Sequence, residues 1–463
     1  MSLENAKRQK SSQMELPLIY RGEAPNDQRS VEALTAANAN ERSSDEHLME
    51  KVVEEGNVRA AIKRVRRNKG GAGIDGMGAE ELPDYMAGKW GQIREELLAG
   101  TYRPKPVRRV EIPKANGGVR QLGIPTVVDR MIQQMLLNVL QPKFDPTFSE
   151  HSYGFRPGRN AHQAVTSAKK YIEQGRTWVV DVDLEKFFDR VNHDILMSKL
   201  AKRIEDKRIL RLIRYYLEAG VMANGVVVER WEGTPQGGPL SPLLANVLLD
   251  EVDKELERRG HTFVRYADDG NVYVKSERAA QDVMATLKRL YAKLRLNINE
   301  AKSRITQVWN SQYLGYGFWM AKGKIVRTCV GVKAKKVMME RVREITSRNG
   351  GRSLEQVAKE LKEYLTGWRI YFRLVETPGV FAKLDKWISH RMRMIRLKQW
   401  KRGTTIFREL RLRGINKYAA ASISATPRSW WKMSGTSALN IAIPNSYFAK
   451  LGVPRLADYK ATF

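Results

Sequence analysis

Residues 263–274 read Phe-Val-Arg-Tyr-Ala-Asp-Asp-Gly-Asn-Val-Tyr-Val, so that apolar residues stand on both sides of an acidic pair. Two apolar runs separated by a short polar step are typical of antiparallel strands joined by a tight turn. At the tip of such a hairpin, adjacent side chains leave the alternation of a strand, and Asp268 and Asp269 can lie beside the same pocket. On its own, an Asp-Asp pair favours a solvated turn, so the interpretation depends on the surrounding sequence.

A second acidic strand lies upstream, where residues 178–184 read Trp-Val-Val-Asp-Val-Asp-Leu. Asp181 and Asp183 stand two residues apart, and the period of a strand puts both on one face. An acidic strand and an acidic hairpin tip would together offer oxygen ligands from rigid elements, which a hard ion such as Mg²⁺ requires. We therefore predict that Asp183 meets Asp268 and Asp269 at a metal site, with Asp181 as the competing candidate on its strand.

The composition indicates a polyanionic partner. The 463 residues contain 81 Lys and Arg against 51 Asp and Glu, a net charge of +30. Lys and Arg bind phosphates with release of counterions, which favours nucleic acid, although basic secreted or ribosomal-type proteins share this charge. A single cysteine, Cys329, excludes an intramolecular disulfide and a paired-thiolate zinc site. We expect a soluble cytosolic protein without a signal peptide or a membrane-spanning helix.

Four segments differ in their pattern. Residues 1–42 are rich in Ser, Asn, Glu and Gln, which predicts a mobile tail. Residues 43–335 mix helical and strand patterns, including a β-hairpin over 107–122. Beyond about residue 335 the strand pattern fades, and helical stretches interleaved with Arg, Lys, Trp and Tyr dominate. The pattern predicts an α+β catalytic body followed by an α-helical basic region.

Six blocks of sequence occur in a fixed order and resemble those of bacterial group II intron reverse transcriptases, also called maturases. The resemblance extends from about residue 45 to the C-terminus, and six ordered blocks are far more specific than one acidic pair. The blocks are Asn68-Lys69-Gly70-Gly71-Ala72-Gly73-Ile74-Asp75-Gly76, Arg120-Gln121-Leu122-Gly123-Ile124-Pro125, Tyr153-Gly154-Phe155-Arg156-Pro157-Gly158-Arg159, Asp183-Leu184-Glu185-Lys186-Phe187-Phe188-Asp189, Gly233-Thr234-Pro235-Gln236-Gly237-Gly238-Pro239-Leu240-Ser241-Pro242 and Tyr313-Leu314-Gly315-Tyr316, together with Tyr266-Ala267-Asp268-Asp269.

The resemblance implies a right-hand polymerase fold. Fingers and a palm with an antiparallel sheet are expected over 43–335, an α-helical thumb and maturase region over 336–420, and a DNA-binding-like region over 421–463. The expected activity is RNA-directed DNA polymerisation with deoxynucleoside triphosphates. The expected partners are structured RNA, above all the protein's own group II intron during splicing and retrohoming, a DNA primer and target DNA. The expected location is the bacterial cytosol or nucleoid, without a membrane partner.

Carried over by position, the resemblance implies that Asp183 and Asp268 are side-chain metal ligands and that Asp269 is the supporting acid. The backbone carbonyl of Leu184 would contact the metal bound with the nucleotide. Nucleotidyl transfer of this kind uses two divalent ions about 3.5–4 Å apart, so we expect two Mg²⁺ ions. The family's spacing to the following pair of Phe residues selects Asp183 over Asp181, for which we expect a supporting or structural role.

The resemblance also suggests how the nucleotide is held. Phe188 resembles the steric gate that excludes a ribose 2′-OH, while Phe187 would lie in the core, because one of two adjacent rings must be buried. Lys114 and Arg120 flank the turn Asn116-Gly117-Gly118 and resemble the fingers hairpin that closes on the triphosphate. The alternative for this pair is an ordinary charged hairpin edge.

Three further assignments each keep an alternative. Gln236 and Gly237 resemble a loop beside the nucleotide, but a tight turn before a helix near Leu243 fits as well. Lys302 resembles the lysine that protonates departing pyrophosphate, although a lysine after a helix is often a solvated charge. The block beginning at Tyr313 resembles the primer grip, and its aromatic content equally suits a hydrophobic floor.

The stretch from Lys383 to Arg413 has eleven basic residues against two acidic ones, a net charge of +9. A charge run is usually a solvated face, but beside a polymerase a phosphate track is expected. A single Cys and six His without zinc-type spacing indicate a type that lacks the endonuclease domain of many relatives. The predicted nucleic-acid contacts are Arg156, Tyr313, Arg391, Arg393, Arg396, Lys398 and Arg402.

Two other functions compete with this prediction. A splicing cofactor could bind RNA without polymerising, although intact Asp183, Asp268 and Asp269 disfavour it. A domesticated relative could serve DNA repair or phage defence, and the residues alone do not separate it from an intron-encoded enzyme.

Overall fold

The computed structural model describes residues 47–113, 119–223, 226–228, 231–234, 237–425 and 429–458. The chain forms two compact units, the first ending at Gln307 and the second beginning at Val308. The predicted tail over 1–42 lies outside the described residues. Within the described ranges, no helix combines the length and the apolar character needed to cross a membrane.

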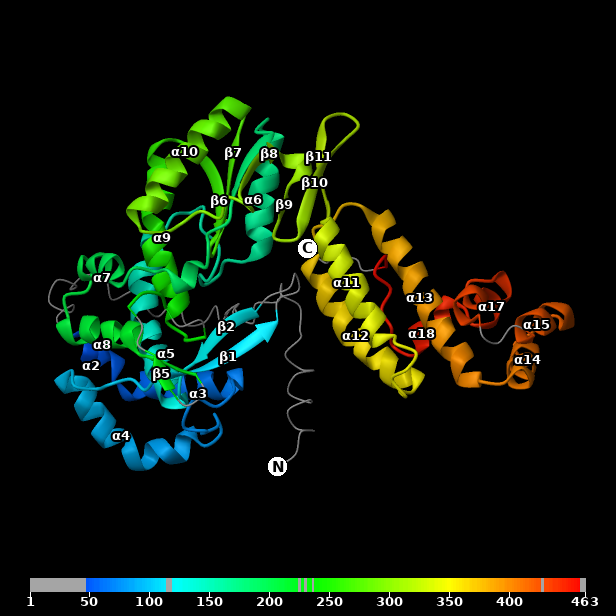
Figure 1. The fold of residues 1–463 in the computed structure, drawn as a ribbon, viewed down its shortest axis with the longest axis horizontal. Coiled ribbons are helices and arrows are strands. Elements are labelled where there is room, and N and C mark those ends of the chain that lie inside the picture. Colours follow the sequence, from blue (N-terminus) through cyan, green and yellow to red (C-terminus); the bar gives the residue numbers. More distant parts are fainter. Residues whose placement is uncertain are drawn as a thin grey trace. The chain divides into compact units, whose positions relative to one another are not determined.

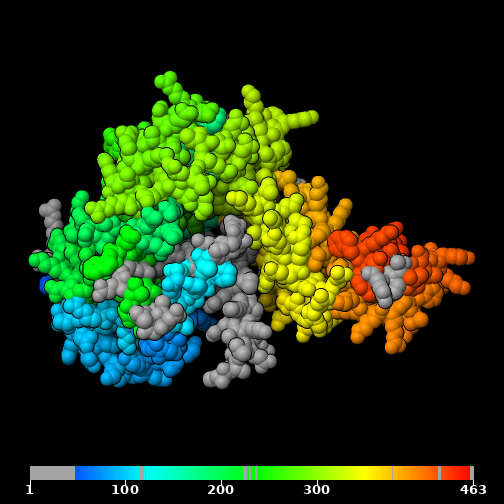
Figure 2. Space-filling view, viewed as in Figure 1, coloured from blue at the N-terminus to red at the C-terminus, as the bar shows by residue number. Residues whose placement is uncertain are grey.

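The first unit begins with helices that surround a buried helix, α5 (Val127–Phe144). This helix is buried on nearly all sides because apolar residues such as Met131 and Leu136 occupy most of its surface. The side chain of Thr126 accepts a hydrogen bond from the Asp129 backbone N–H and fixes the start of the helix. Figure 2 shows the early segments, in blue and cyan, as one continuous surface. The helices α2 (Leu48–Val52) and α3 (Glu55–Asn68) pack against α5, and α4 (Leu82–Ala99) packs against α2 and α3.

A small sheet with the strand order β2-β1-β4-β5 extends from this helical body. Its first two strands form an antiparallel pair, which confirms the hairpin predicted over 107–122. Lys114 and the turn beyond it lie outside the described residues. The strands are β1 (Val107–Pro113), β2 (Val119–Ile124), β4 (Val221–Ala223) and β5 (Val226–Val228).

The predicted antiparallel sheet with the two acidic elements is present, with the strand order β6-β7-β3-β8. The predicted hairpin forms strands β6 and β7, and the predicted acidic strand over 178–184 forms β3. Because β7 lies between β6 and β3 and is antiparallel to both, the hairpin tip and the C-terminal end of the acidic strand lie at the same end of the sheet. The strands are β3 (Trp178–Val182), β6 (Thr262–Tyr266), β7 (Asp269–Val274) and β8 (Arg304–Gln307).

The two faces of this sheet are covered by different helices. Val180 and Val182 on one face belong to the apolar core shared with α9 (Ser241–Arg258) and α10 (Glu277–Lys293), which Figure 1 shows together on one side of the strands. On the other face, the ring of Tyr273 lies 6.1 Å from the ring of Tyr171 in α6 (Ala161–Glu173). Register and alternation place Asp181, Asn271 and Asp269 on this second face.

Shorter elements complete the first unit. A 3₁₀ turn, η4 (Phe187–Asp189), follows β3 and is followed by α7 (His193–Ala201) and α8 (Lys207–Glu218). The helix α8 begins after Asp206, whose side chain accepts a hydrogen bond from the Arg208 backbone N–H. Another 3₁₀ turn, η3 (Asp145–Thr147), follows α5.

The second unit is mainly helical, as predicted for the region beyond about residue 335. A small antiparallel sheet precedes the helices, so this unit begins earlier in the chain than the boundary at 335 drawn from the sequence. Its core contains the buried rings of Trp368, Phe372 and Phe381. The elements are η5 (Val308–Asn310), β9 (Gln312–Tyr313), β10 (Tyr316–Ala321), β11 (Ile325–Val330), α11 (Val332–Ile345), α12 (Leu354–Tyr371), α13 (Pro378–Trp400), α14 (Gly403–Leu412), α15 (Lys417–Ser424), α16 (Trp430–Ser434), α17 (Ser437–Ala442) and α18 (Asn445–Lys450).

Candidate active site

The hairpin between β6 and β7 has a two-residue loop. Tyr266 and Asp269 face each other across the strands, and Ala267 and Asp268 form the turn between them. Ala267 has φ +58°, in the left-handed region that two-residue hairpin loops require and that an alanine adopts at a cost of about 1 kcal/mol. A strained backbone at this position persists only because neighbouring groups hold it, which is common at functional sites.

Four carboxyl groups lie near one another at this end of the sheet, those of Asp181, Asp183, Asp268 and Asp269. Val182 pairs with Gly270, so the next residue of β3, Asp183, comes level with Asp269. Removal from water, followed by the nearby carboxyl groups of Asp181, Asp268 and Asp183, raises the pKa of Asp269 well above its usual value. The predicted meeting of the acidic strand with the Asp268-Asp269 turn is therefore present in the fold.

Two cations lie against this cluster. Lys302 Nζ is 3.3 Å from Asp183 Oδ2, and Arg304 Nε is 3.4 Å from Asp181 Oδ2. Arg304 is also the cross-strand neighbour of Asp181, which gives Asp181 a cation from an adjacent strand. Asp183 is the more accessible of the two acids, with 45% of its side chain exposed against 20% for Asp181.

The acid cluster suits divalent cations that also bind a substrate. Among the described residues, no three His, Cys, Asp or Glu side chains converge closely enough to enclose a metal ion by themselves. Mg²⁺ usually takes one or two carboxylates and completes its shell with water and substrate phosphate oxygens. The nearby carboxyl groups that raise the pKa of Asp269 repel one another when ionised, and a bound cation would reduce this repulsion.

The end of β3 is held by a loop that also carries Lys302. The Asp183 backbone N–H donates to Ser303 Oγ at 3.0 Å, and its carbonyl accepts from the Asn299 N–H at 2.8 Å. Leu184 and Ile298 form an isolated β-bridge. The hydrogen bonds of this bridge are made by the residues that flank these two in the sequence, not by Leu184 and Ile298 themselves. The Leu184 carbonyl is therefore not used in this bridge, as the predicted metal contact requires.

A buried polar network supports the hairpin turn from below. Arg265 forms an ion pair with Asp253 at 2.6 Å and donates to the Ala267 carbonyl at 2.8 Å. It also donates to Asn246 Oδ1, and the Asn246 amide donates to the Gly154 carbonyl at 3.0 Å. Buried charges are stable only when paired and hydrogen-bonded, so this network fixes one position for the turn.

Gly154 lies directly against the turn. A Cβ atom at Gly154 would be 2.1 Å from the Ala267 backbone nitrogen and 2.8 Å from the Tyr266 carbonyl carbon. No sequence pattern marked Gly154, Arg265, Asn246 or Asp253 as a site residue. The signal available was an arginine inside an otherwise apolar strand, since such a charge needs a buried partner.

Arg156 has a structural role and not the nucleic-acid role predicted for it. It is 7% exposed, and its guanidinium donates to both Asp145 carboxylate oxygens and the Asp145 carbonyl. It also donates to the carbonyls of Ser149 and Ser152, at 2.6 and 3.0 Å. These bonds use every guanidinium N–H, so none is left for a phosphate.

We expect Arg156→Met to lower the free energy of unfolding by roughly 3 kcal/mol, because it removes the cation paired with Asp145 and the hydrogen bonds to the Ser149 and Ser152 carbonyls. Urea unfolding followed by circular dichroism measures this loss. Arg94→Met on the exposed surface of α4 is the matched control and should change stability by less than about 0.5 kcal/mol. Unchanged stability with weakened RNA binding would restore the nucleic-acid role.

Both phenylalanines of the predicted gate pair are buried. Phe187 is 2% exposed and Phe188 6%, with ring centroids 5.0 Å apart in an edge-on arrangement. The Phe188 carbonyl accepts from the Thr234 N–H, and a Cβ at Gly233 would collide with the backbone of Phe188 and Asp189. The start of the Gly-Thr-Pro-Gln-Gly block is thus attached to the turn that carries Phe188.

The predicted nucleotide-binding residues are described only in part. Lys114 and Gln236 lie outside the described residues, and only the backbone of Arg120 is described, in β2 opposite Ile112. Gly237 is exposed with φ +133°, and a Cβ there would be 2.7 Å from the Gly123 carbonyl oxygen. Only glycine fits at position 237, because any side chain there would collide with the backbone of β2.

In the second unit, two predicted contacts are buried. Tyr313 is 1% exposed, which fits the alternative of a hydrophobic floor. Arg393 is 5% exposed and donates to the Ile443 carbonyl and to Asn445 Oδ1, so it attaches α13 to the C-terminal helices and does not face a phosphate as predicted. The correction for Arg393 has a physical cause, since a buried helix needs polar anchors as well as apolar ones.

The remaining predicted contacts are accessible to different degrees. Arg391 donates to the Thr346 hydroxyl and carbonyl, and Lys398 donates to the Arg348 carbonyl at 2.8 Å. Arg396 is half-buried, while Arg402 is exposed just before α14. The buried apolar residues of α13 include Ile388, Met392, Ile395, Leu397 and Trp400.

Comparisons with known proteins agree with this arrangement. Residues 112–318 match the family described as reverse transcriptase (RNA-dependent DNA polymerase), and residues 335–414 match the group II intron maturase-specific domain. The chain is 34% identical over 275 residues to Protein YkfC of Escherichia coli, covering 51% of this chain and 72% of that protein. It is 38% identical over 195 residues to the group II intron-encoded protein LtrA of Lactococcus lactis, covering 42% of this chain and 32% of that protein.

Among solved structures, a chain of the partial Cas6-RT-Cas1--Cas2 complex aligns with a TM-score of 0.35 and 27% identity. This alignment covers 54% of the present chain and 42% of that one. The chain spans about a third of the length of LtrA and most of the length of YkfC.

Proposed function

The chain belongs to the reverse transcriptase family and carries the group II intron maturase-specific domain, and we propose that it copies RNA into DNA at the cluster of Asp183, Asp268 and Asp269. Membership of the family implies nucleotide substrates and divalent metal ions. The observation that supports the proposed site most strongly is the crowding of these acids, from distant parts of the sequence, around Asp269. We further propose two Mg²⁺ ions and deoxynucleoside triphosphates as the specific cofactors and substrates.

The carboxylates of Asp183 and Asp268 and the carbonyl of Leu184 would hold the ions. Bound there, two divalent ions activate the attacking hydroxyl of the primer and stabilise the charge on the leaving pyrophosphate. Asp269 supports this site by adding negative charge beside the two ligands. The network of Arg265, under the turn, keeps Asp268 at a fixed position before substrate arrives.

Lys302 is proposed as the donor of a proton to departing pyrophosphate. Its ammonium group lies 3.3 Å from Asp183 Oδ2, and two-thirds of its side chain is exposed, so it can reach a substrate beside the acids. A general acid typically contributes about 10²–10⁴-fold to the rate. Lys114, Arg120, Gln236 and Gly237 stay proposed contacts of the incoming nucleotide.

Phe188 is proposed to exclude ribonucleotides, and Phe188→Ala should raise their incorporation relative to deoxynucleotides roughly tenfold or more. The reason is steric, because the smaller side chain leaves room for a 2′-OH. Primer extension with each nucleotide type in parallel measures the ratio. Phe187→Ala is the matched control, since it removes an equally buried ring and should leave the ratio unchanged. Equal ratios in both variants would place the gate elsewhere.

The proposed polymerase activity is tested by primer extension with the wild-type chain on an RNA template, with Mg²⁺ and deoxynucleoside triphosphates. We expect processive addition that stops when a chelator is added. A chain that adds no deoxynucleotides but still binds structured RNA would be the non-polymerising splicing cofactor. Extension of a DNA template only would contradict RNA-directed synthesis.

The second unit is proposed to bind the RNA of the protein's own group II intron and to assist splicing and retrohoming, with a DNA primer and target DNA as further partners. The maturase-specific match over 335–414 supports this proposal. Exposed or half-buried basic residues, among them Arg391, Arg396, Lys398 and Arg402, are its proposed contacts. The bacterial cytosol or nucleoid is the proposed location, which suits a chain with a single cysteine.

A further inference from the structure

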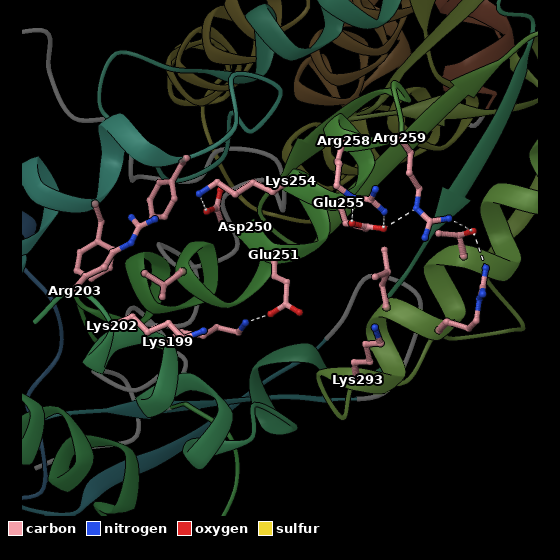
Figure 3. Close-up of a pocket in the computed structure, with 16 residues that line it drawn as sticks. Lys199, Lys202, Arg203, Asp250, Glu251, Lys254, Glu255, Arg258, Arg259 and Lys293 are labelled. Carbon is pink, nitrogen blue, oxygen red and sulfur yellow. Dashed lines mark hydrogen bonds and ion pairs between the residues drawn. The ribbon is translucent and has the colours of Figure 1, made fainter.

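A basic cleft lies on the side of the first unit that the acid cluster does not use. It has a volume of about 850 Å³ and is formed mainly by residues of α7, α9 and α10. Its lining contains eight Lys and Arg residues against three acidic residues. Figure 3 shows Lys199 and Lys202 from α7 and the loop after it, Lys254 and Arg258 from α9, and Lys293 from α10 around the cleft.

The acidic residues of the cleft already have partners. Lys254 Nζ is 2.6 Å from Asp250 Oδ2, and Lys199 pairs with Glu251. Glu255 accepts ion pairs from two arginines of its own helix, each at 2.7 Å. The acids therefore neutralise part of the lining and leave a net surplus of positive charge.

Four residues carry most of this surplus. Within the described part of the chain, Lys202, Arg203, Arg289 and Lys293 have no carboxylate at ion-pair distance. Arg203 donates to the Thr147 hydroxyl and Arg289 to the Thr286 hydroxyl, both neutral groups. Burial, and to a smaller extent the neighbouring ammonium of Lys202, lower the pKa of Lys199.

The chemistry of the lining favours a phosphate backbone over unpaired bases. The unpaired cations lie on both sides of the cleft and do not converge on a single position, so they suit several successive phosphates of a nucleic-acid backbone better than one phosphate group. The aromatic residues of the lining, Phe144 and Phe148, are 1% and 4% exposed, so they offer no ring face to a base. Double-stranded RNA is recognised mainly through its backbone and shape.

The cleft is also separate from the place where a template is copied. The acids lie on the face of the sheet that α6 covers, whereas α9 and α10 cover the opposite face and form the cleft. The part of an RNA template that lies at Asp268 therefore does not lie in the cleft. The cleft is thus open to a second RNA segment, and the maturase-specific match is consistent with structured RNA as a partner of this chain.

We propose that this cleft binds the phosphate backbone of a double-stranded RNA segment, apart from the primer–template at the acid cluster. The proposal rests on the proposed function in one respect, namely that the protein works on structured RNA. It adds a site in the first unit to the RNA contacts proposed for the second.

The test compares two triple variants with equal loss of charge. Lys202→Gln, Arg289→Gln and Lys293→Gln together remove three exposed cations of the cleft and leave no acid unpaired. The control variant combines Lys89→Gln, Arg94→Gln and Lys275→Gln, which are exposed residues of the same unit outside the cleft. The probe is a long RNA stem-loop without a single-stranded 3′ end, titrated at several salt concentrations.

We expect the cleft variant to bind the stem-loop at least about tenfold more weakly, with a salt dependence shallower by about three units, one for each lost phosphate contact. The control variant should keep most of its affinity. Both variants should extend a primer on a short single-stranded template at the wild-type rate, which shows that each is folded.

Equal losses in the two variants would overturn the proposal, since general charge would then explain the binding. An equal loss for a DNA duplex of the same sequence would overturn the assignment to RNA. If the wild type binds the stem-loop through the cleft but extends no primer, the proposed polymerase function fails while the cleft site stands.

Discussion

Asp268→Ala is expected to reduce primer extension on an RNA template by at least about 10³-fold, with little change in the fold or in RNA affinity. Asp268 offers one of the two side chains proposed to hold the metal ions, and losing their stabilisation of the transition state removes several kcal/mol. Each 1.36 kcal/mol corresponds to a tenfold change in rate. Initial rates of single deoxynucleotide addition at saturating Mg²⁺ measure the effect.

The fold should tolerate this change. Asp268 lies in a turn and contributes to the carboxyl crowding that raises the pKa of Asp269, so its removal relieves repulsion. A melting temperature equal to or above that of the wild type is therefore expected. Asp282→Ala, which removes an exposed acid from α10, is the matched control and should keep wild-type rates.

The comparison of Asp181 with Asp183 sharpens this result. Asp181→Asn should keep most of the activity, because Asp181 is the less exposed acid and is not a proposed metal ligand, whereas Asp183→Asn should abolish it. An inactive Asp181→Asn beside an active Asp183→Asn would exchange the two assignments. Full activity of Asp268→Ala would remove the turn from the catalytic site altogether.

The hairpin and the acidic strand could be predicted because local patterns determine them. Alternation over 263–274 requires two strands, and two acids in an apolar run at 178–184 need polar surroundings at the strand end. Pairing β7 with β3 follows once both must bury one face. Each acidic element can thus be predicted locally, while the meeting of Asp183 with Asp268 and Asp269 depends on the long-range pairing of β3 with β7.

The arginines show why other residues could not be assigned from sequence. Arg156 and Arg393 donate to buried carbonyl and carboxylate groups, while Arg402 is exposed, although all three stand in strongly basic or glycine-rich surroundings. A guanidinium that satisfies a buried acceptor and one that binds phosphate have identical chemistry. Only the direction of the side chain separates them, and that depends on tertiary packing.

The basic cleft was missed for a related reason. Its surplus cations, including Lys202, Arg289 and Lys293, come from helices far apart in the sequence, and no single stretch of those helices is as basic as residues 383–413. A local charge count therefore favours the second unit. The cleft exists only because α7, α9 and α10 pack side by side against the same core.

Gly154→Ala is expected to lower the rate of primer extension by about 10²-fold and to destabilise the first unit by about 1–3 kcal/mol. The added Cβ would lie 2.1 Å from the Ala267 nitrogen and 3.0 Å from its Cα. These are backbone atoms, so the turn must shift as a whole and take Asp268 with it. A displacement of about 1 Å is sufficient for a loss of this size.

Measuring the rate and the stability of Gly154→Ala separately distinguishes a displaced Asp268 from a less stable fold. Rates of nucleotide addition should fall at temperatures well below the melting transition, where the variant is folded. Asn246→Ala offers a second variant, because it removes the hydrogen bond to the Gly154 carbonyl and one acceptor of Arg265 without adding bulk under the turn. Its loss of stability should be similar, about 1–3 kcal/mol, while its loss of rate should be smaller.

Gly88→Ala is the matched control, since Gly88 lies in the exposed helix α4 with no atom within 4 Å of an added Cβ. There the substitution should stabilise the helix by up to about 1 kcal/mol and leave the rate unchanged. Wild-type rates in Gly154→Ala would mean that the turn can yield without moving Asp268. The close packing of Gly154 against Ala267 would then serve stability alone, and the support of the acid cluster would have to come from Arg265 and its partners.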